Sequence, residues 1–137
     1  MIYTTYDSSG EFLFSVADNG TYTIPANSTE GTYTSDHSYF DLVQQQVVAK
    51  PQKPSNQHVW NTDNKNWMLD LNLLATKERT CRNQLLSQLD RVNPVWYATL
   101  TAEQQAELAV YRQALLDVPQ QADFPANIAW PTKPTWL

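Results

Sequence analysis

The change in composition near residue 50 is the feature that most constrains the fold. Residues 1–49 are rich in Tyr, Thr, Val and Phe and contain all three glycines, which is typical of strands and turns. Two prolines then fall within four residues, which excludes a regular helix and favours extended chain. Leucines at helical spacing follow from residue 69 onward. We therefore predict an α+β protein with a small strand-rich N-terminal domain, residues 1–49, and a Pro-containing linker, residues 50–58.

Antiparallel hairpins are the expected structure of the N-terminal domain. A first strand is predicted over residues 2–6, and further strands over residues 39–43 and 47–49. Between them, apolar residues alternate on one face before and after the turn sequence Asp18–Gly20, which predicts a second hairpin. The alternating residues are Phe12, Phe14, Val16, Tyr22 and Ile24.

An aromatic hairpin is predicted over residues 59–68. Val59 and Trp60 lie opposite Trp67 and Met68 across a run of polar turn-forming residues. Cross-strand tryptophans would hold such a hairpin together. No internal repeat is visible in the sequence.

Two antiparallel helices are predicted over residues 69–119. Asp70 is a candidate N-cap for the first helix, whose apolar stripe is interrupted by Glu78 and Arg82. This interruption has two explanations: the first turns project beyond the core, or this face docks onto another chain. Stripe residues are Leu71, Leu74, Cys81, Leu85, Leu89 and Val92.

The second helix begins with a capping box formed by Thr101 and Gln104. Pro119 ends the helix, and the tail, residues 120–137, is predicted to be extended because it contains three prolines. An irregular connection around Trp96 and Tyr97 is expected between the helices. The apolar face of the second helix comprises Leu108, Tyr111, Leu115 and Val118.

The composition argues against several classes of function. A net charge of −5 provides no field that would gather phosphates, so nucleic acid is not expected as a partner. The single cysteine, Cys81, cannot form an intramolecular disulfide or a thiolate zinc site and is expected to be a buried structural thiol. Neither a signal peptide nor an apolar run long enough to span a membrane is visible, which favours a cytoplasmic protein without membrane partners.

Catalytic and cofactor sites are not predicted. His37 and His58 lie in polar, turn-like segments without a second metal ligand at suitable spacing. The glycines are spaced for separate turns and not for a phosphate-binding loop. An enzyme would require a site formed only on folding, from these histidines and dispersed carboxylates.

Tryptophans are the unusual feature of the composition. Trp60, Trp67 and Trp96 are expected to be core or hairpin residues. Trp130 and Trp136 lie in the proline-containing tail. Such a tail either packs on its own domain or offers aromatic anchors to a partner.

The order of these features resembles the tail fibre assembly proteins of tailed bacteriophages, also called tail assembly chaperones. The match is specific over residues 79–134 and loose over the first 50 residues. Its most specific residues are Tyr111-Arg112-Gln113-Ala114-Leu115 with Asp117 and Pro119, then Trp130-Pro131 and Pro134, preceded by Leu85-Leu86 and Asp90. This sequence departs from the family pattern at Arg91, Leu108 and Leu116.

The resemblance implies a non-enzymatic chaperone without a cofactor, acting in the cytoplasm of the bacterial host during phage assembly. It would bind a trimeric tail fibre protein and assist its folding, trimerisation or attachment. We assign partner contacts to Tyr111, Arg112, Trp130 and Trp136, although an ion pair of Arg112 with Asp90 or Asp117 is the favoured role of that side chain. The variable N-terminal domain is the candidate for recognising a particular fibre.

A structural component of the tail tip, baseplate or fibre that stays in the virion is the alternative. Self-association of the chain is also left open.

Overall fold

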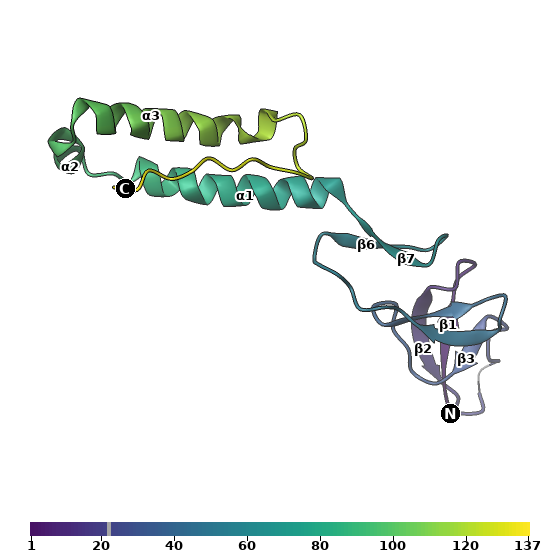
Figure 1. The fold of residues 1–137 in the computed structure, drawn as a ribbon. Coiled ribbons are helices and arrows are strands. Elements are labelled where there is room, and N and C mark those ends of the chain that lie inside the picture. The colour runs from purple at the N-terminus through teal and green to yellow at the C-terminus, as the bar shows by residue number, and fades with distance from the viewer. Residues whose placement is uncertain (22) are drawn as a thin grey trace. The chain divides into compact units, whose positions relative to one another are not determined.

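The computed structural model describes residues 1–21 and 23–137, which form two compact units, Met1–Leu69 and Asp70–Leu137. Antiparallel strands make up the first unit and helices the second (Figure 1). This arrangement confirms the predicted α+β class.

A three-stranded antiparallel sheet begins the N-terminal unit. β1 (Ile2–Tyr6) lies between β2 (Phe12–Ala17) and β3 (Ser28–Glu30). The turn from β1 to β2 is held by the Asp7 carboxylate and by Gly10, which has a φ of +85°. A side chain at Gly10 would also collide with the backbone of Phe40. Glycine is therefore required at this position both by the positive φ and by the lack of space.

The prediction that β2 forms a hairpin with the residues after Asp18–Gly20 is wrong. The turn at Asp18–Gly20 forms, with the Gly20 amide donating to the Asp18 carboxylate over 2.9 Å. However, the chain then crosses to the far side of β1, where β3 pairs with β1 and not with β2. Ile24 lies outside any strand, and Tyr22 lies outside the described residues. Pairing with the central strand β1 therefore prevails over the local turn.

A bulge in β2 overturns the prediction that Phe12 and Phe14 share one face. Thr4 is opposite Ser15, whereas Tyr6 is opposite Phe12, so an extra residue is accommodated in β2. Phe12 is consequently buried in the core, while Phe14 is 59% exposed. Alternation along a strand fails at such a bulge because the side chains beyond it change face.

Two further hairpins complete the N-terminal unit. β4 (Ser38–Asp41) pairs with β5 (Gln46–Ala49), and β6 (His58–Asn61) pairs with β7 (Asn66–Leu69). The second of these places Trp60 directly opposite Trp67, which confirms the predicted cross-strand tryptophans.

Aromatic packing joins the sheet to the first hairpin. Tyr6 stacks on Phe40 with ring centroids 4.1 Å apart, and Phe12 belongs to the same buried cluster. The ammonium group of Lys50, just after β5, forms an ion pair of 2.9 Å with Glu11, and the Lys50 side chain is only 2% exposed. The segment after residue 50 is thus anchored where it leaves the hairpin.

Two long helices form the C-terminal unit. α1 (Leu71–Asp90) begins at Asp70, whose carboxylate accepts two backbone N–H groups, and α3 (Ala102–Asp117) begins with the predicted capping box. In that box, the Thr101 hydroxyl accepts from the Gln104 backbone while the Gln104 side chain accepts from the Thr101 backbone. Both helix starts were therefore predicted correctly.

The connection between the long helices is itself helical, contrary to the irregular segment predicted around Trp96 and Tyr97. α2 (Pro94–Thr99) has Asn93 as its N-cap and Pro94 in its first turn. Proline is compatible with this position because the first backbone N–H groups of a helix have no intrahelical acceptor. After α3, a short 3₁₀ turn, η1 (Val118–Gln120), ends the helical region.

Candidate functional site

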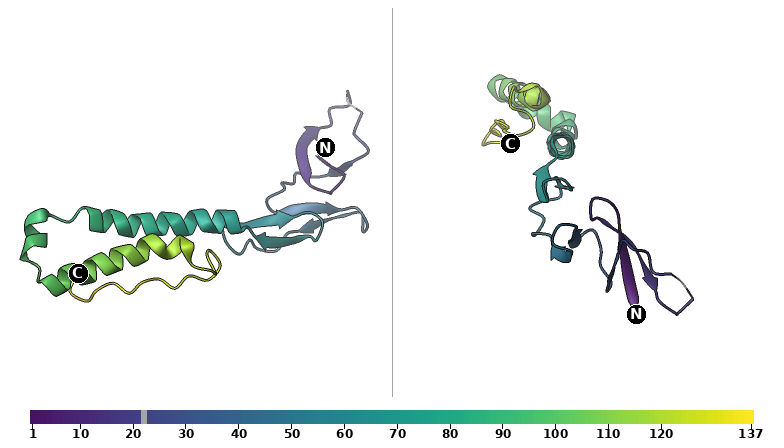
Figure 2. Two further views of the ribbon diagram at one scale, coloured as in Figure 1. Left: turned by 90° about the horizontal axis from the view of Figure 1, so that it is seen from above. Right: turned by 90° about the vertical axis from the view of Figure 1, so that its right-hand side faces the viewer.

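The helical pair α1 and α3 is the scaffold of the candidate site. The helices pack antiparallel, and Leu86, Tyr111 and Leu115 form their buried cluster (Figures 1 and 2). Leu115 and Val118 are fully buried. The predicted apolar face of the second helix is confirmed, since Leu108, Tyr111, Leu115 and Val118 are all buried.

The two charged residues in the stripe of α1 are only partly paired. The Lys77 ammonium lies 3.4 Å from the Glu78 carboxylate. Arg82 approaches the backbone carbonyl of Leu116 at 3.5 Å, and its buried Nε atom has no hydrogen-bond partner. Arg82 thus reaches toward α3, while the apolar cluster between α1 and α3 lies further along α1, at Leu85, Leu86 and Leu89.

The C-terminal tail folds back along one side of the helix pair (Figure 2). Gln121 fastens its beginning: the side-chain amide donates to the Ala129 carbonyl and accepts from the Ala129 N–H, both at 2.9 Å. The guanidinium of Arg79 lies over the Phe124 ring, 5.2 Å from its centroid. These contacts set the direction in which the tail leaves the turn after η1.

The far end of the tail is fastened by aromatic and apolar contacts. The Trp136 indole donates to the Glu107 carboxylate on α3 and packs on Trp96 of α2, with ring centroids 6.5 Å apart. Leu137 packs against the cluster that contains Tyr111. The tail is therefore a third element of the helical unit and packs on its own chain.

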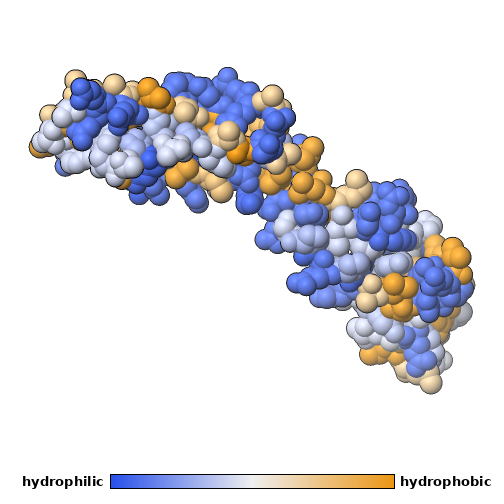
Figure 3. All heavy atoms as spheres, in the orientation of Figure 1, coloured by the Kyte–Doolittle hydropathy of each residue, from blue (hydrophilic) through white to orange (hydrophobic). Residues whose placement is uncertain are grey.

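An apolar groove of about 630 Å³ lies between α3 and the tail. Ala106, Val110 and Ala114, spaced four residues apart on α3, form one wall, and Pro131 and Pro134 form part of the other. Val110 is 69% exposed, which is high for a valine in a helix beside apolar neighbours. In Figure 3, apolar atoms reach the surface between polar ones along this unit.

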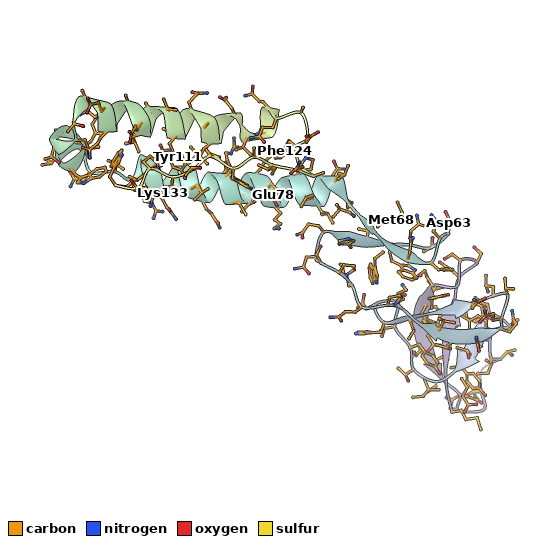
Figure 4. All side chains as sticks on the ribbon, viewed as in Figure 1. Asp63, Met68, Glu78, Tyr111, Phe124 and Lys133 are labelled. Carbon is orange, nitrogen blue, oxygen red and sulfur yellow. The ribbon has the colours of Figure 1, made fainter. Side chains whose placement is uncertain are left out.

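Charged groups also line this groove. Glu107 and Lys133 take part in the lining, and Figure 4 shows Lys133 on the tail and Tyr111 directed from α3 toward the space between the two helices. An apolar groove with a few polar groups is suited to binding an apolar segment of another molecule.

The four predicted partner-binding residues occupy different environments. Tyr111 is buried, and it is one of the residues that line the groove. Arg112 forms an ion pair of 3.0 Å with Asp90, which confirms the pairing favoured from the sequence. Both of these charged side chains are about half exposed, so the pair contributes little to stability.

The two tail tryptophans are separated by the structure. Trp130 is 38% exposed and lines a depression on α1 beside Cys81, whereas Trp136 is half-buried against α2 and α3. Direct partner contact by any of the four residues stays a prediction. Sequence reasoning missed Ala106, Val110 and Ala114, although their spacing of four residues marks one face of a helix.

Residues 1–21 and 23–137 contain no group of three or more His, Cys, Asp or Glu side chains that could hold a metal ion. Each histidine has a local partner: His37 bonds to the Thr34 hydroxyl and His58 to the Ser55 hydroxyl. Cys81 is half-buried and was predicted to be buried. No helix in the described part of the chain is long and apolar enough to cross a membrane.

Comparison with known families identifies the region that contains the groove. Residues 75–135 match the family described as phage tail assembly chaperone protein. This match confirms the resemblance found in the sequence and spans most of α1, all of α2 and α3, and most of the tail. No match was found among curated proteins or among solved structures.

Proposed function

Residues 75–135 carry the signature of phage tail assembly chaperones, and from this premise we propose that the chain is a non-enzymatic chaperone for a tail fibre protein. The match supports a role in phage tail assembly. We further propose that the client is a fibre protein that trimerises. Its action takes place in the host cytoplasm while tails are assembled.

The physical need for such a chaperone comes from unassembled chains. A chain that becomes intertwined with identical copies exposes apolar surface and unpaired strand edges until its partners arrive, and both promote aggregation. A small protein that covers part of this surface would delay aggregation without consuming ATP. The net charge of −5 would also favour solubility of the chain itself.

We propose that the groove between α3 and the tail binds an apolar segment of the client. Exposed Val110 and the two flanking alanines provide a surface on which backbone can approach closely, and two tail prolines hold the opposite wall. Prolines reduce the entropy lost when the wall is ordered around a bound segment. The single observation that carries this proposal is that the groove lies inside the matched residues 75–135.

Co-expression of the neighbouring fibre gene with and without this chain tests the proposal. We expect soluble, trimeric fibre protein to accumulate only when the chain is present. The Val110→Asp variant should lower the yield, because it introduces a charge into the apolar groove. Its matched control is Ala109→Asp, which adds the same side chain at the neighbouring exposed position outside the groove lining.

Two outcomes would refute the proposal. Equal yields of trimeric fibre with and without the chain would exclude a chaperone role. Equal loss in both aspartate variants would show that the groove itself is not the binding surface. Mass spectrometry of purified particles adds a further criterion, since stoichiometric amounts of this chain in the virion would indicate a structural component.

A further inference from the structure

The two hairpins of the N-terminal unit, β4–β5 and β6–β7, are built alike at a spacing of 20 residues. The same strand register is found in both hairpins. The first hairpin runs from Ser38 opposite Ala49 to Asp41 opposite Gln46, and adding 20 to each of these numbers gives the pairs of the second hairpin. This repeat was not visible in the sequence, because no residue from 38 to 49 is identical to the residue 20 positions later.

The turns of the two hairpins have the same construction. The Asp41 carboxylate accepts the backbone N–H groups two and three residues later, both at 2.9 Å, and the Asn61 side chain does the same at 3.1 and 2.7 Å. Four residues after each of these, Gln45 and Lys65 have positive φ angles of 54° and 51°. The likeness is therefore one of backbone conformation as well as of register.

Each face of the first hairpin is covered by a different neighbour. Residues directly opposite in an antiparallel pair share a face, and successive residues alternate between faces. Phe40 turns to the three-stranded sheet, where it stacks on Tyr6. Tyr39 turns to the second hairpin, where it lies 5.6 Å from Trp60 and under the ammonium of Lys65 at 4.8 Å. The three-stranded sheet, the β4–β5 hairpin and the β6–β7 hairpin thus form a stack, in which each member packs on the next.

Only one face of the second hairpin packs on the first hairpin. Trp60 and Trp67, with ring centroids 5.3 Å apart, make up the face that covers Tyr39. The opposite face carries the cross-strand pair Val59 and Met68, which are 42% and 45% exposed. Figure 4 shows Met68 projecting from β7 to the side away from the three-stranded sheet.

The Val59–Met68 face is the counterpart of a face that already binds a hairpin. Val59 and Met68 are 20 residues after Tyr39 and Val48, the pair onto which the second hairpin is laid. Tyr39 is 8% exposed because that hairpin covers it. In stacked repeats, a terminal copy requires a polar outer face to be stable alone in water. Here the polar pair Asn61 and Asn66 occupies the turn end of the face, but its other end carries the exposed apolar pair Val59 and Met68.

We propose that the Val59–Met68 face is a docking site for a β-hairpin of the client protein that carries a cross-strand aromatic pair. The bound hairpin would extend the stack by one member, in the same way that the Trp60–Trp67 face extends it within this chain. This assignment of the partner rests on the proposed chaperone function. The docking surface itself rests on the equivalence of the two hairpins.

A first experiment measures binding in the full chain. The double variant Val59→Asp, Met68→Asp should weaken capture of the co-expressed fibre protein by at least about ten-fold, because two charges would be buried on docking. Val43→Asp is the matched control: Val43 is 92% exposed at the tip of the β4–β5 turn, away from this face. Unchanged capture by the double variant, with its far-UV circular dichroism preserved, would overturn the proposal.

A second experiment reads the surface without any client. A second copy of residues 50–69 is inserted between Leu69 and Asp70 of the full chain. The extra hairpin should dock on the face of the original one and raise the urea midpoint of the N-terminal unit, and the double variant in the original copy should abolish this rise. An unchanged midpoint on insertion would show that the face does not accept a hairpin. This experiment tests the docking surface even if the fibre protein folds equally well without the chain, because it uses no client.

Discussion

Leu115→Ala provides the most direct test of how the helical unit is held together. Leu115 is completely buried and packs with Leu86 and Tyr111 at the contact between α1 and α3. Replacing it removes three carbons from a closely packed site, and the neighbouring side chains close such a void only in part. We therefore expect unfolding of the C-terminal unit to become easier by about 3 kcal/mol, within the usual range of about 2 to 5.

The magnitude is large enough to separate from a helix-propensity effect. About 3 kcal/mol corresponds to a rise of roughly two orders of magnitude in the unfolded population. Alanine is the better helix former by a few tenths of a kcal/mol, which acts in the opposite direction. The matched control is Val110→Ala on the same helix, where the side chain is 69% exposed and the expected change is within about 0.5 kcal/mol.

Urea unfolding followed by far-UV circular dichroism measures both variants, because the long helices of the described chain all lie in the C-terminal unit. The midpoint should fall strongly for Leu115→Ala and stay near that of the unmodified chain for Val110→Ala. A loss below about 1 kcal/mol for Leu115→Ala, or equal losses for both, would refute the assignment of Leu115 to the centre of this core.

Three further predictions concern single contacts. Gly10→Ala should destabilise the N-terminal unit by at least about 2 kcal/mol in thermal unfolding, since a Cβ at this positive φ would lie 2.1 Å from the Phe40 carbonyl oxygen; a neutral result would contradict the close approach. Hydrogen bonds within the turn, chiefly from the hydroxyl two residues on, lower the pKa of Asp7 below its usual 3.8. The Asp7 carboxylate therefore contributes its full stabilisation above its unfolded-state pKa, and this contribution is lost as the pH falls through its lowered folded-state pKa. The Asp7→Asn variant should consequently lose less stability on acidification than the unmodified chain. An unchanged acid dependence of the free energy of unfolding would contradict this role of Asp7. Arg112→Ala should change stability by less than about 1 kcal/mol, because its pair with Asp90 is half exposed; a larger loss in urea unfolding would mean that the pair is shielded from water.

The helical unit was the more predictable part, and its capping signals explain why. Asp70, Thr101 and Gln104 act on backbone groups within three residues, so short stretches of sequence determine where α1 and α3 begin. The same local chemistry predicted the turns at Asp18–Gly20 and in the aromatic hairpin. Features that depend on neighbours a few residues away can be recognised without knowledge of the rest of the chain.

Strand pairing in the first sheet was less predictable, since it depends on choices between distant partners. β1 pairs with both β2 and β3, and the bulge in β2 redirects Phe14 to solvent although Phe12, two residues earlier, is buried. Neither feature has a signature in the alternation of apolar residues. The course of the tail was also open, because prolines predict an extended segment but not the surface along which it lies.

The groove illustrates the same limit at the candidate site. Its α3 wall is made of two alanines and a valine, which give a weak apolar signal in the sequence, and its other wall comes from a segment about 20 residues further along the chain. Tyr111 and Trp136, two of the residues assigned to partner contacts from the sequence, also make contacts within the unit, Tyr111 in the buried cluster and Trp136 with Glu107 and Trp96. If the proposed groove binds the client, Val110→Asp should impair binding more selectively than Tyr111→Ala, because Tyr111 is buried between the helices and its removal would also destabilise the unit.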